Sequence, residues 1–374
     1  MAVLIDGVRK IAVLRANALG DFLVTLPALE ALRAAYPAAE IVLLGADWHG
    51  RLMDGRPGPV DRVVPVPPTP GVRLDGVEDP AAVEAFVAAM RAERFDLAVQ
   101  MHGGGRSSNP LVARLGARVT AGFRTSDAPP LDRTVPYAWY QPEVLRHLEL
   151  VGLVGAEPVT LQPRLSLVDS DRAEARSVLG GRTGPLVALH PGAADPRRCW
   201  PTGAFAAVGD GLAERGAQVL LTGSGAERGV VAEVAARMRA PALCLVDAVS
   251  VGGLAAVYER CAVLVSNDTG PRHLAAAVGT ATVGIFWAGN MVNAGPGTRR
   301  HHRAHVSWTV RCPACGVPLP EPELPARHHG RLCPHQDSWV AEVDPAAVLA
   351  DALDLLGSAA DLTRAPRDVA ALPA

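Results

Sequence analysis

The fold of this chain is decided by a stretch near its carboxyl end, from Cys261 to Val278, which reads Cys-Ala-Val-Leu-Val-Ser-Asn-Asp-Thr-Gly-Pro-Arg-His-Leu-Ala-Ala-Ala-Val. The apolar run 262–265 predicts a strand buried on both faces, and the alanine-rich run that begins at Pro271 predicts a helix. The polar turn between them is therefore a strand-to-helix crossover. In a parallel sheet such crossovers lie at the carboxyl ends of the strands, where ligands bind.

Four residues of this crossover point to an anionic ligand: Asp268, Thr269, Gly270 and His273. The free backbone N–H groups at the start of a helix attract anions, so we expect a phosphate-like group here. The alternative is that Asp268 or Thr269 only caps the helix, as residues of these types often do.

Two other crossovers in the same half of the chain carry similar chemistry. After the strand predicted at 186–189, backbone N–H groups are available from Gly192 onward, and the guanidinium of Arg198 suits a two-pronged grip on phosphate. After the strand predicted at 218–221, Gly223 begins a helix and Glu227 is close enough to accept from ribose hydroxyls. Three strand ends of one sheet thus offer phosphate and sugar chemistry, which is a stronger argument than any single motif.

The second of these crossovers also leaves a different enzyme class open. Its sequence, Gly223-Ser-Gly225-Ala-Glu-Arg-Gly229, approaches the dinucleotide-binding fingerprint, and Asp247 follows about twenty residues later. A nicotinamide-dependent dehydrogenase is therefore an alternative. Against it, the third glycine is wrongly spaced, and the motif follows the second strand of its half, whereas the fingerprint follows the first.

The first half of the chain alternates strand and helix patterns, which predicts another doubly wound parallel sheet. Gly20 and Asp21 stand at its first crossover, where the helix dipole favours an ionised carboxylate that can accept a proton from a substrate hydroxyl. An acidic residue that only interacts with the dipole is the alternative. Three glycines between His102 and Arg106 would either let a ligand lie against the backbone or form a flexible loop.

Composition narrows the class of protein. With 374 residues, 49% of them hydrophobic, the chain is long enough for two domains, which we expect at 1–165 and 166–374. It has 36 basic and 38 acidic residues and no basic run, so we expect no nucleic-acid partner. Charges at residues 6, 9 and 10 do not suit a signal peptide, and no apolar run is long enough to span a bilayer, so we expect a cytoplasmic protein without a transmembrane segment.

A cluster near the end of the chain supplies four ligands of the kinds that bind zinc tetrahedrally: Cys312, Cys315, Cys333 and His335. His328 or His329 could compete with His335, and a disulfide or free thiols are the alternatives to a metal. We expect a structural zinc that fixes the loop 312–335 and takes no part in catalysis. The run Asp169-Ser170-Asp171 resembles the paired aspartates by which some sugar transferases hold a metal, but it directly precedes a predicted helix, so we interpret it as a helix cap.

Four motifs, in order over about residues 10–350, give the chain a family likeness. They are Leu19-Gly20-Asp21 followed by Thr25-Leu26-Pro27-Ala28-Leu29; His190-Pro191-Gly192 with Arg198-Cys199-Trp200-Pro201; Gly223-Ser-Gly225-Ala-Glu227; and Asn267-Asp268-Thr269-Gly270-Pro271-Arg272-His273-Leu274-Ala275. Together they resemble glycosyltransferase family nine, the ADP-heptose:lipopolysaccharide heptosyltransferases. The last motif is the most specific.

The resemblance implies the GT-B architecture, an α/β fold in which two Rossmann-like, doubly wound domains face each other across a cleft. It implies that the first domain binds a saccharide or other hydroxyl acceptor, that the second binds an ADP-sugar, and that a C-terminal helix packs back on the first domain. The expected reaction is the inverting transfer of a heptose or similar sugar without a catalytic metal. A protein that binds a nucleotide sugar without catalysis is the remaining alternative.

The resemblance also implies residue roles. Asp21 would be the general base, Glu227 the ribose contact and Asp268 the group facing the donor sugar. The diphosphate would be held by the helix start at 269–273 and by Arg198, which stands where the family usually has lysine. Two departures concern the donor: Ala193 and Ala194 replace a phosphate-binding Ser or Thr, and the sequence at 286–290 is unlike that of relatives.

Overall fold

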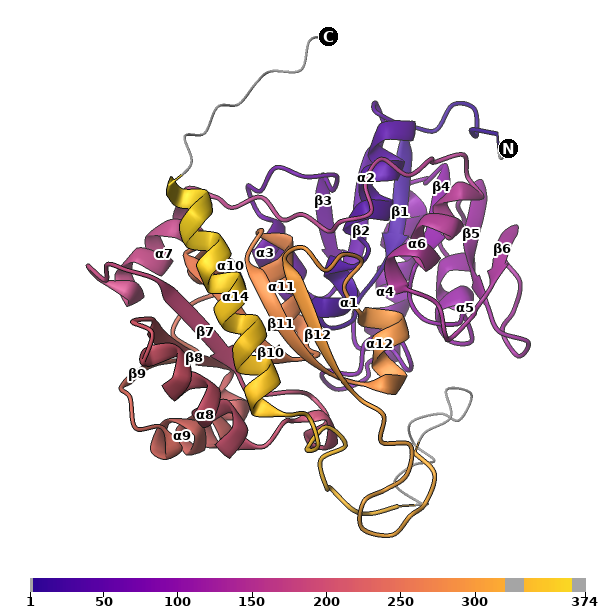
Figure 1. Ribbon diagram of the computed structural model, residues 1–374. Coiled ribbons are helices and arrows are strands. Elements are labelled where there is room, and N and C mark those ends of the chain that lie inside the picture. Colours follow the sequence, from indigo (N-terminus) through magenta and orange to yellow (C-terminus); the bar gives the residue numbers. More distant parts are fainter. Residues whose placement is uncertain (1–2, 320–332, 365–374) are drawn as a thin grey trace.

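The computed structural model describes residues 3–319 and 333–364, and within these residues it contains two parallel six-stranded sheets (Figure 1). Residues up to about 136 form the first sheet, and residues from 186 form the second, with helices between successive strands. The two sheets occupy the two lobes of the molecule in Figure 1, and helices from both lobes meet between them. The predicted α/β fold with two doubly wound units is confirmed.

The first sheet contains β1 (Lys10–Leu14), β2 (Glu40–Gly45), β3 (Arg62–Pro65), β4 (Leu97–Gln100), β5 (Val119–Arg124) and β6 (Arg133–Pro136). Its helices are α1 (Leu19–Leu23), α2 (Leu26–Ala35), α3 (Asp47–Met53), α4 (Pro80–Ala92), α5 (Ser108–Ala113) and α6 (Glu143–Gly152). The spatial order of the strands is β3-β2-β1-β4-β5-β6, which is the order of a dinucleotide-binding domain.

The second sheet contains β7 (Leu186–His190), β8 (Gln218–Gly223), β9 (Ala242–Val246), β10 (Cys261–Asn267), β11 (Ala281–Trp287) and β12 (His302–Ser307). Around it lie α7 (Asp169–Leu179), α8 (Thr202–Ala213), α9 (Arg228–Arg237), α10 (Val251–Glu259), α11 (Gly270–Ala277), α12 (Ala288–Ala294), α14 (Pro345–Arg364) and the 3₁₀ turns η1 (Pro196–Arg198) and η2 (Gly225–Glu227). The order β12-β11-β10-β7-β8-β9 repeats that of the first sheet.

Both sheets are covered on two faces, which explains why their central strands are apolar runs. In β1, Ile11 and Val13 face one buried core, while Ala12 and Leu14 face another beneath α4. The core that holds Ile11 continues into the second sheet, where it includes Leu264 of β10. The two sheets therefore share buried apolar surface.

Several element boundaries follow the sequence prediction closely. Pro27 lies at the start of α2, so the regular helix begins there instead of being kinked by the proline. The strands β5, β6 and β12 were not predicted, because glycine interrupts β5 and because β12 reads His-Arg-Ala-His-Val-Ser and is only half buried at the sheet edge.

No helix among the described residues is long and apolar enough to cross a bilayer.

The last helix corrects one expectation. We expected it to pack back on the first domain, but the described part of α14 lies against α8, β10 and β11 (Figure 1). Its apolar face, formed by Val348, Ala352 and Leu355, belongs to the core of the second sheet. This face has the helical spacing that a single buried stripe requires, and the second sheet supplies the matching surface.

A buried ion pair joins the two halves of the chain near the point where they are connected. Arg56, after α3, bonds Asp171 of α7 through two nitrogens, Nη1 to Oδ2 at 2.7 Å and Nη2 to Oδ1 at 3.1 Å, and the two side chains are 2% and 7% exposed. Asp171 Oδ2 also accepts a hydrogen bond from the backbone N–H of Val168 at 3.0 Å. Asp171 thus caps the start of α7, the role that the sequence predicts for the run 169–171, and it also makes an interdomain contact that the sequence did not predict.

Replacing Asp171 with asparagine should lower the free energy of unfolding by about 3 kcal/mol, because it leaves the Arg56 guanidinium buried without its charge partner. The neighbouring Asp169→Asn is the matched control, since Asp169 is exposed and should cost well under about 1 kcal/mol. Urea unfolding followed by circular dichroism measures both. Equal small losses in the two variants would contradict this account of the pair.

Candidate active site

The carboxyl ends of the two sheets face each other through the helices that follow β1 and β10. A Cβ atom added to Gly20 of α1 would lie 3.0 Å from Cδ2 of His273 in α11. A Cβ atom on Gly270 would lie 3.1 Å from Cβ of Leu19 and 3.2 Å from the backbone nitrogen of Gly20. A side chain at either glycine would therefore crowd the facing helix, and the first-domain crossover with Asp21 is brought directly against the second-domain crossover with Asp268.

Asp21 is held in place by a buried arginine, Arg15, which the sequence analysis did not single out. Arg15, at the end of β1, donates from Nε to the backbone oxygen of Asp21 at 2.9 Å, and its Nη2 lies 3.3 Å from Asp21 Oδ1. The same nitrogen lies 3.9 Å from Glu143 Oε2. One guanidinium thus fixes both the backbone and the side chain of Asp21. A charged residue directly after an apolar strand was the available signal.

The environment of Asp21 raises the pKa of its carboxyl. Desolvation is the main cause, since surrounding protein limits water around the charge even though 44% of the side-chain surface is accessible. The positive charges of Arg15 and of Arg198 act in the opposite direction. Arg198 belongs to the second domain, so its effect places the two residues within electrostatic reach of each other. A raised pKa makes Asp21 a stronger proton acceptor than an ordinary aspartate.

A cavity of about 530 Å³ opens beside Asp21 on the first domain. Its lining includes Trp48, Asp75 and His102. His102 is buried, which lowers the pKa of its ring to about 3, and its Nδ1 accepts the backbone N–H of Ala16 at 3.3 Å. The ring is therefore neutral and keeps its proton on Nε2.

The other first-domain candidate lies apart from this cavity. Arg106 is exposed and pairs with Asp127 at 3.6 Å. The glycines that precede Arg106 serve the packing of their own loop: Gly105 has φ +96°, and a Cβ atom there would lie 2.5 Å from the backbone oxygen of Phe123. The loop is thus shaped by its contact with β5.

On the second domain, Asp268 is buried and fully engaged by side chains. Its Oδ1 accepts from Arg272 Nη2 at 3.1 Å, and its Oδ2 accepts from Asn290 Nδ2 at 3.0 Å. Thr269, the N-cap of α11, makes no side-chain cap bond. The backbone start of α11 is therefore not capped by Thr269, and Asp268 serves to order Arg272 and Asn290. Neither partner received a role in the sequence analysis, although Arg272 stands inside the most specific motif.

Arg272 of α11 is buried, and the side chain of its neighbour His273 is 15% exposed. Burial lowers the pKa of Arg272, opposed by Asp268, and its guanidinium lies 4.8 Å from the ring centre of Phe286. Burial and the charge of Arg272 lower the pKa of His273 to about 3. His273 is thus a neutral ring next to Gly20, so the positive charge near this helix start comes from arginine.

The crossovers after β7 and β8 are joined by Glu227. Its Oε2 accepts from the backbone N–H and the hydroxyl of Ser224, both at 2.8 Å, and its Oε1 lies 3.5 Å from Nε2 of His190. A Cβ atom on Gly192 would lie only 1.9 Å from Oε1. The space beside Gly192 is therefore filled by Glu227. Gly223 has a similar packing role, because a Cβ atom there would lie 2.7 Å from Val231.

Arg198 lies in η1 and is half buried. Within the described residues, its guanidinium takes part in no hydrogen bond or ion pair of the structure, unlike its neighbour Arg197, which pairs with Asp195 at 2.7 Å. The loop is anchored by Asn267, which accepts from Trp200 N–H at 2.9 Å and donates to the oxygen of Pro191 at 2.7 Å. A fixed backbone thus presents a guanidinium with unused donors.

The predicted metal ligands are brought together. The ligand atoms of Cys312, Cys315, Cys333 and His335 all lie within 4.8 Å of one another. All the described cysteines are free, which contradicts the disulfide alternative. His328 and His329 lie outside the described residues.

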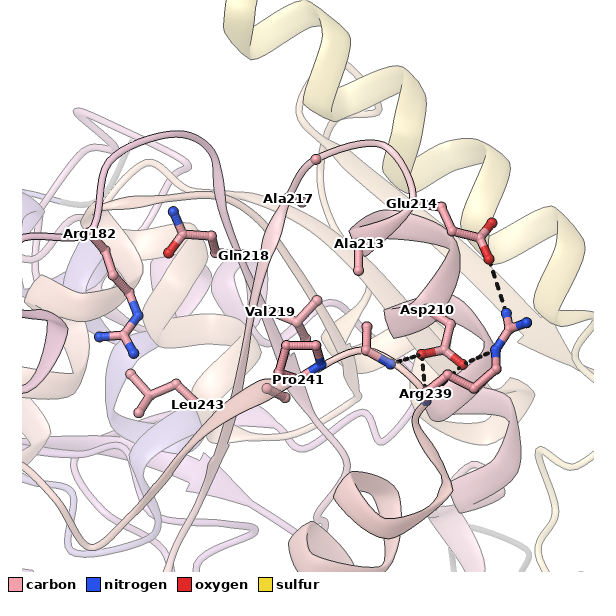
Figure 2. A pocket seen from close by; sticks show the side chains of 13 residues that line it. Arg182, Asp210, Ala213, Glu214, Ala217, Gln218, Val219, Arg239, Pro241 and Leu243 are labelled. Atoms are coloured by element: carbon pink, nitrogen blue, oxygen red, sulfur yellow. Dashed lines mark hydrogen bonds and ion pairs between the residues drawn. The ribbon is translucent and has the colours of Figure 1, made fainter.

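A larger cavity, of about 770 Å³, lies at the opposite edge of the second sheet (Figure 2). It is lined by the amino-terminal starts of β8 and β9, whereas ligands of such sheets bind at the carboxyl ends. Three of its four charged residues are paired with each other, since Arg239 bonds Asp210 and Glu214, each at 3.0 Å. We therefore place the candidate site at the smaller cavity and the facing helix starts.

The setting of Glu227 predicts a stability effect at low pH. Burial alone would raise the pKa of Glu227, but His190 and Ser224 stabilise the carboxylate and lower its pKa to about 2, from 4.5. This stabilisation is present above pH 4.5 and is lost as the pH falls towards 2. The unfolding free energy of the wild type should therefore fall when the pH is lowered from 6 to 3. In Glu227→Gln the fall should be about 2 kcal/mol smaller.

Urea unfolding at the two pH values measures this difference. Glu157→Gln, which removes an exposed carboxylate, is the control and should keep the wild-type pH dependence. An unchanged pH dependence in Glu227→Gln would show that Glu227 is not stabilised as a carboxylate in the folded protein.

Comparison with known proteins agrees with this geometry. The fold, with its two doubly wound sheets, is that of the GT-B glycosyltransferases. Within that class, the chain belongs to glycosyltransferase family 9 (heptosyltransferase), whose family model matches residues 83–315. The protein is thus a heptosyltransferase-like glycosyltransferase. The family match favours a glycosyltransferase over the alternative of a dehydrogenase.

Three similar proteins illustrate the relationship. Lipopolysaccharide heptosyltransferase 3 of Escherichia coli is 26% identical over 300 residues, which cover 73% of this chain and 85% of that protein. The glycosyl transferase family 9 structure from Veillonella parvula has a TM-score of 0.76 at 20% identity and covers 96% of this chain and 99% of its own. The E. coli ADP-heptose lipopolysaccharide heptosyltransferase II has a TM-score of 0.71 at 18% identity, with 94% and 99% covered.

Proposed function

We propose that the protein transfers a heptose or similar sugar from an ADP-sugar to a hydroxyl group of a saccharide or other acceptor, with inversion and without a catalytic metal. The observation that carries the proposal is the position of Asp21. Its carboxyl has a raised pKa, lies beside the first-domain cavity and is within electrostatic reach of Arg198. A base on one domain and a phosphate-binding cation on the other suit a direct displacement.

In this mechanism, Asp21 takes the proton of the acceptor hydroxyl as the oxygen attacks the anomeric carbon. Arg15 positions the carboxylate through its contacts to the backbone and side chain of Asp21. The bond to the diphosphate breaks on the opposite face of the sugar, and inversion follows because there is a single displacement. The cavity with His102 would take the acceptor, so that its hydroxyl lies next to Asp21.

The departing diphosphate gains negative charge, and the second domain offers three groups that stabilise it. These are the backbone N–H groups at 269–270, the guanidinium of Arg198 and the backbone from Gly192 onward. Positive groups fixed in advance lose little energy in reorganisation, so they can replace a metal ion at this step. Asp268, on this proposal, faces the donor sugar through the ordered Asn290.

Support for an adenine nucleotide and a heptose comes from similar proteins alone, among them the E. coli ADP-heptose lipopolysaccharide heptosyltransferase II. Glu227 is the proposed ribose contact, through the carboxylate that its partners keep ionised. The cytoplasmic location stays a prediction of the sequence.

Asp21→Asn should lower kcat by roughly a hundredfold or more, because an amide cannot accept the hydroxyl proton. The Kd for the nucleotide should change little, since Asp21 lies on the other domain. A coupled assay of nucleotide diphosphate release measures turnover, and calorimetry measures binding.

The control for Asp21→Asn is Glu84→Gln, which removes a carboxylate that pairs with Arg114 on the protein surface. It should keep full activity. Full activity in Asp21→Asn would remove Asp21 from the mechanism. Donor binding in a wild type that shows neither transfer nor hydrolysis would instead support the non-catalytic alternative.

A thermal-shift panel tests the donor. ADP and ADP-sugars should raise the melting temperature, because a ligand that binds only the native state stabilises it, while UDP, GDP and dTDP at the same concentration should have smaller effects. Arg198→Ala should reduce the ADP shift. A larger shift with another nucleotide would contradict adenine as the nucleobase of the donor. A shift with NAD(P) alone would support the dehydrogenase alternative.

A further inference from the structure

We propose that Cys312, Cys315, Cys333 and His335 bind one zinc ion, and that this ion fixes the loop that presents Arg198 to the donor. The second part rests on the proposed function, since it assigns a donor contact to Arg198. The sequence predicts a metal that only fixes its own loop. The contacts of the cluster connect it to the nucleotide-binding side of the site.

Two of the distances between the ligand atoms fit a tetrahedral ion, and all four atoms lie within 4.8 Å of one another. Zinc bonds of about 2.3 Å to sulfur and about 2.0 Å to nitrogen place neighbouring ligand atoms roughly 3.5–3.8 Å apart. The Sγ atoms of Cys315 and Cys333 are 3.6 Å apart, and Cys333 Sγ lies 3.5 Å from Nδ1 of His335. A disulfide would need about 2.05 Å between the sulfurs. Three sulfurs and one ring nitrogen are a common zinc ligand set.

A backbone turn holds the first two cysteines. Gly316 has φ +72°, which turns the chain back so that its N–H donates to the oxygen of Cys312 at 2.9 Å. The N–H of Cys312 donates to the oxygen of Val317 at 2.8 Å. The segment that carries Cys312 and Cys315 is thus fixed by its own backbone hydrogen bonds.

The charge of the site has a counterion in the loop that carries Arg198. Three thiolates, one neutral imidazole and Zn²⁺ leave a net charge of about −1. Arg197 lies within electrostatic reach of both Cys312 and Cys333. Its guanidinium also pairs with Asp195, so it connects the metal site to the start of η1. The residue next to Arg198 therefore responds to the cluster directly.

The segment that follows His335 holds the loop on both sides of Arg198. The backbone N–H of Trp339 donates to the oxygen of Arg197 at 2.7 Å, and the Arg197 guanidinium lies 4.4 Å from the centre of the Trp339 ring. Ser338 Oγ donates to the oxygen of Cys199 at 2.6 Å. Arg198 is thus positioned by its two neighbours, and both are bound to residues within four positions of a metal ligand.

Among the described residues, the apolar packing around the ligands is small. The buried cluster consists of Cys312, Leu319, Cys333 and Trp339; Trp287 and Val317 pack against it, and the rings of Trp287 and Trp339 are 4.9 Å apart. Two of the four buried members are proposed zinc ligands, so a bound ion would cross-link this cluster.

The first experiment measures the metal. Protein purified without chelator should contain one zinc per chain by elemental analysis, and replacement by Co²⁺ should give thiolate-to-cobalt absorption. Cys333→Ser should lose both signals. Cys244→Ser, at an exposed cysteine of β9, is the matched control and should keep both. Wild-type protein with no zinc and no cobalt absorption would overturn the site.

The second experiment measures ADP binding by calorimetry. Removal of zinc with a chelator, or Cys333→Ser, should raise the Kd for ADP about tenfold or more, the scale for misplacing one charged hydrogen-bond donor, and re-added zinc should restore the chelated protein. At saturating donor, kcat should fall as well, because Arg198 also stabilises the charge that develops on the departing diphosphate. Trp339→Leu keeps every ligand, so it should retain zinc but weaken ADP binding.

A double-variant comparison separates this role from general stability. In Arg198→Ala, which already lacks the guanidinium, removing zinc should change the Kd for ADP little further. An unchanged Kd in zinc-free protein that stays folded by circular dichroism would overturn the positioning role. If zinc removal unfolds the chain, Trp339→Leu decides: unchanged ADP affinity there overturns the role. Failure of the zinc-loaded wild type to bind ADP would overturn the proposed donor and leave the metal result standing.

Discussion

The close approach of α1 and α11 is the contact on which the rest of the site depends. Gly20 and Gly270 lack side chains, so the crossovers after β1 and β10 come within van der Waals distance. Each crossover lies at the carboxyl edge of its own sheet, and the contact therefore turns two separate ligand-binding edges towards one space. Asp21 and Arg198, which come from different domains, are within electrostatic reach of each other in this arrangement.

The electrostatics of the site follow from burial around a few arginines. The histidines at 102 and 273 are neutral because burial lowers their pKa values to about 3, so they contribute hydrogen bonds and shape. Arg15 and Arg272 are buried, and they donate hydrogen bonds to Asp21 and Asp268 respectively. Arg198 alone of these guanidinium groups makes no hydrogen bond within the described part of the chain, which suits it to an incoming phosphate. Arg15 and Arg272 thus position the two aspartates, whereas Arg198 is available to bind a ligand.

Much of this could be predicted from the sequence, and the failures have physical causes. Apolar runs ending in polar, glycine-containing turns located the strand ends, and so they located Asp21, Glu227 and Asp268. The edge strand β12 and the partner of α14 could not be predicted, because a half-buried edge lacks a clear pattern and an apolar helix face does not specify its partner. Arg15 and Arg272 were missed because their importance lies in contacts with residues brought close only by the fold.

The pair formed by Gly192 and Glu227 limits how this enzyme can be re-engineered. Any residue other than glycine at 192 would occupy the place of the Glu227 carboxylate, so a substitution there displaces a side chain on a different strand end. Libraries aimed at new donors should therefore keep both positions together and diversify Ala193 and Ala194, whose side chains are partly or fully exposed. Changes in donor specificity are then expected at Ala193 and Ala194, next to Gly192, which keeps its glycine.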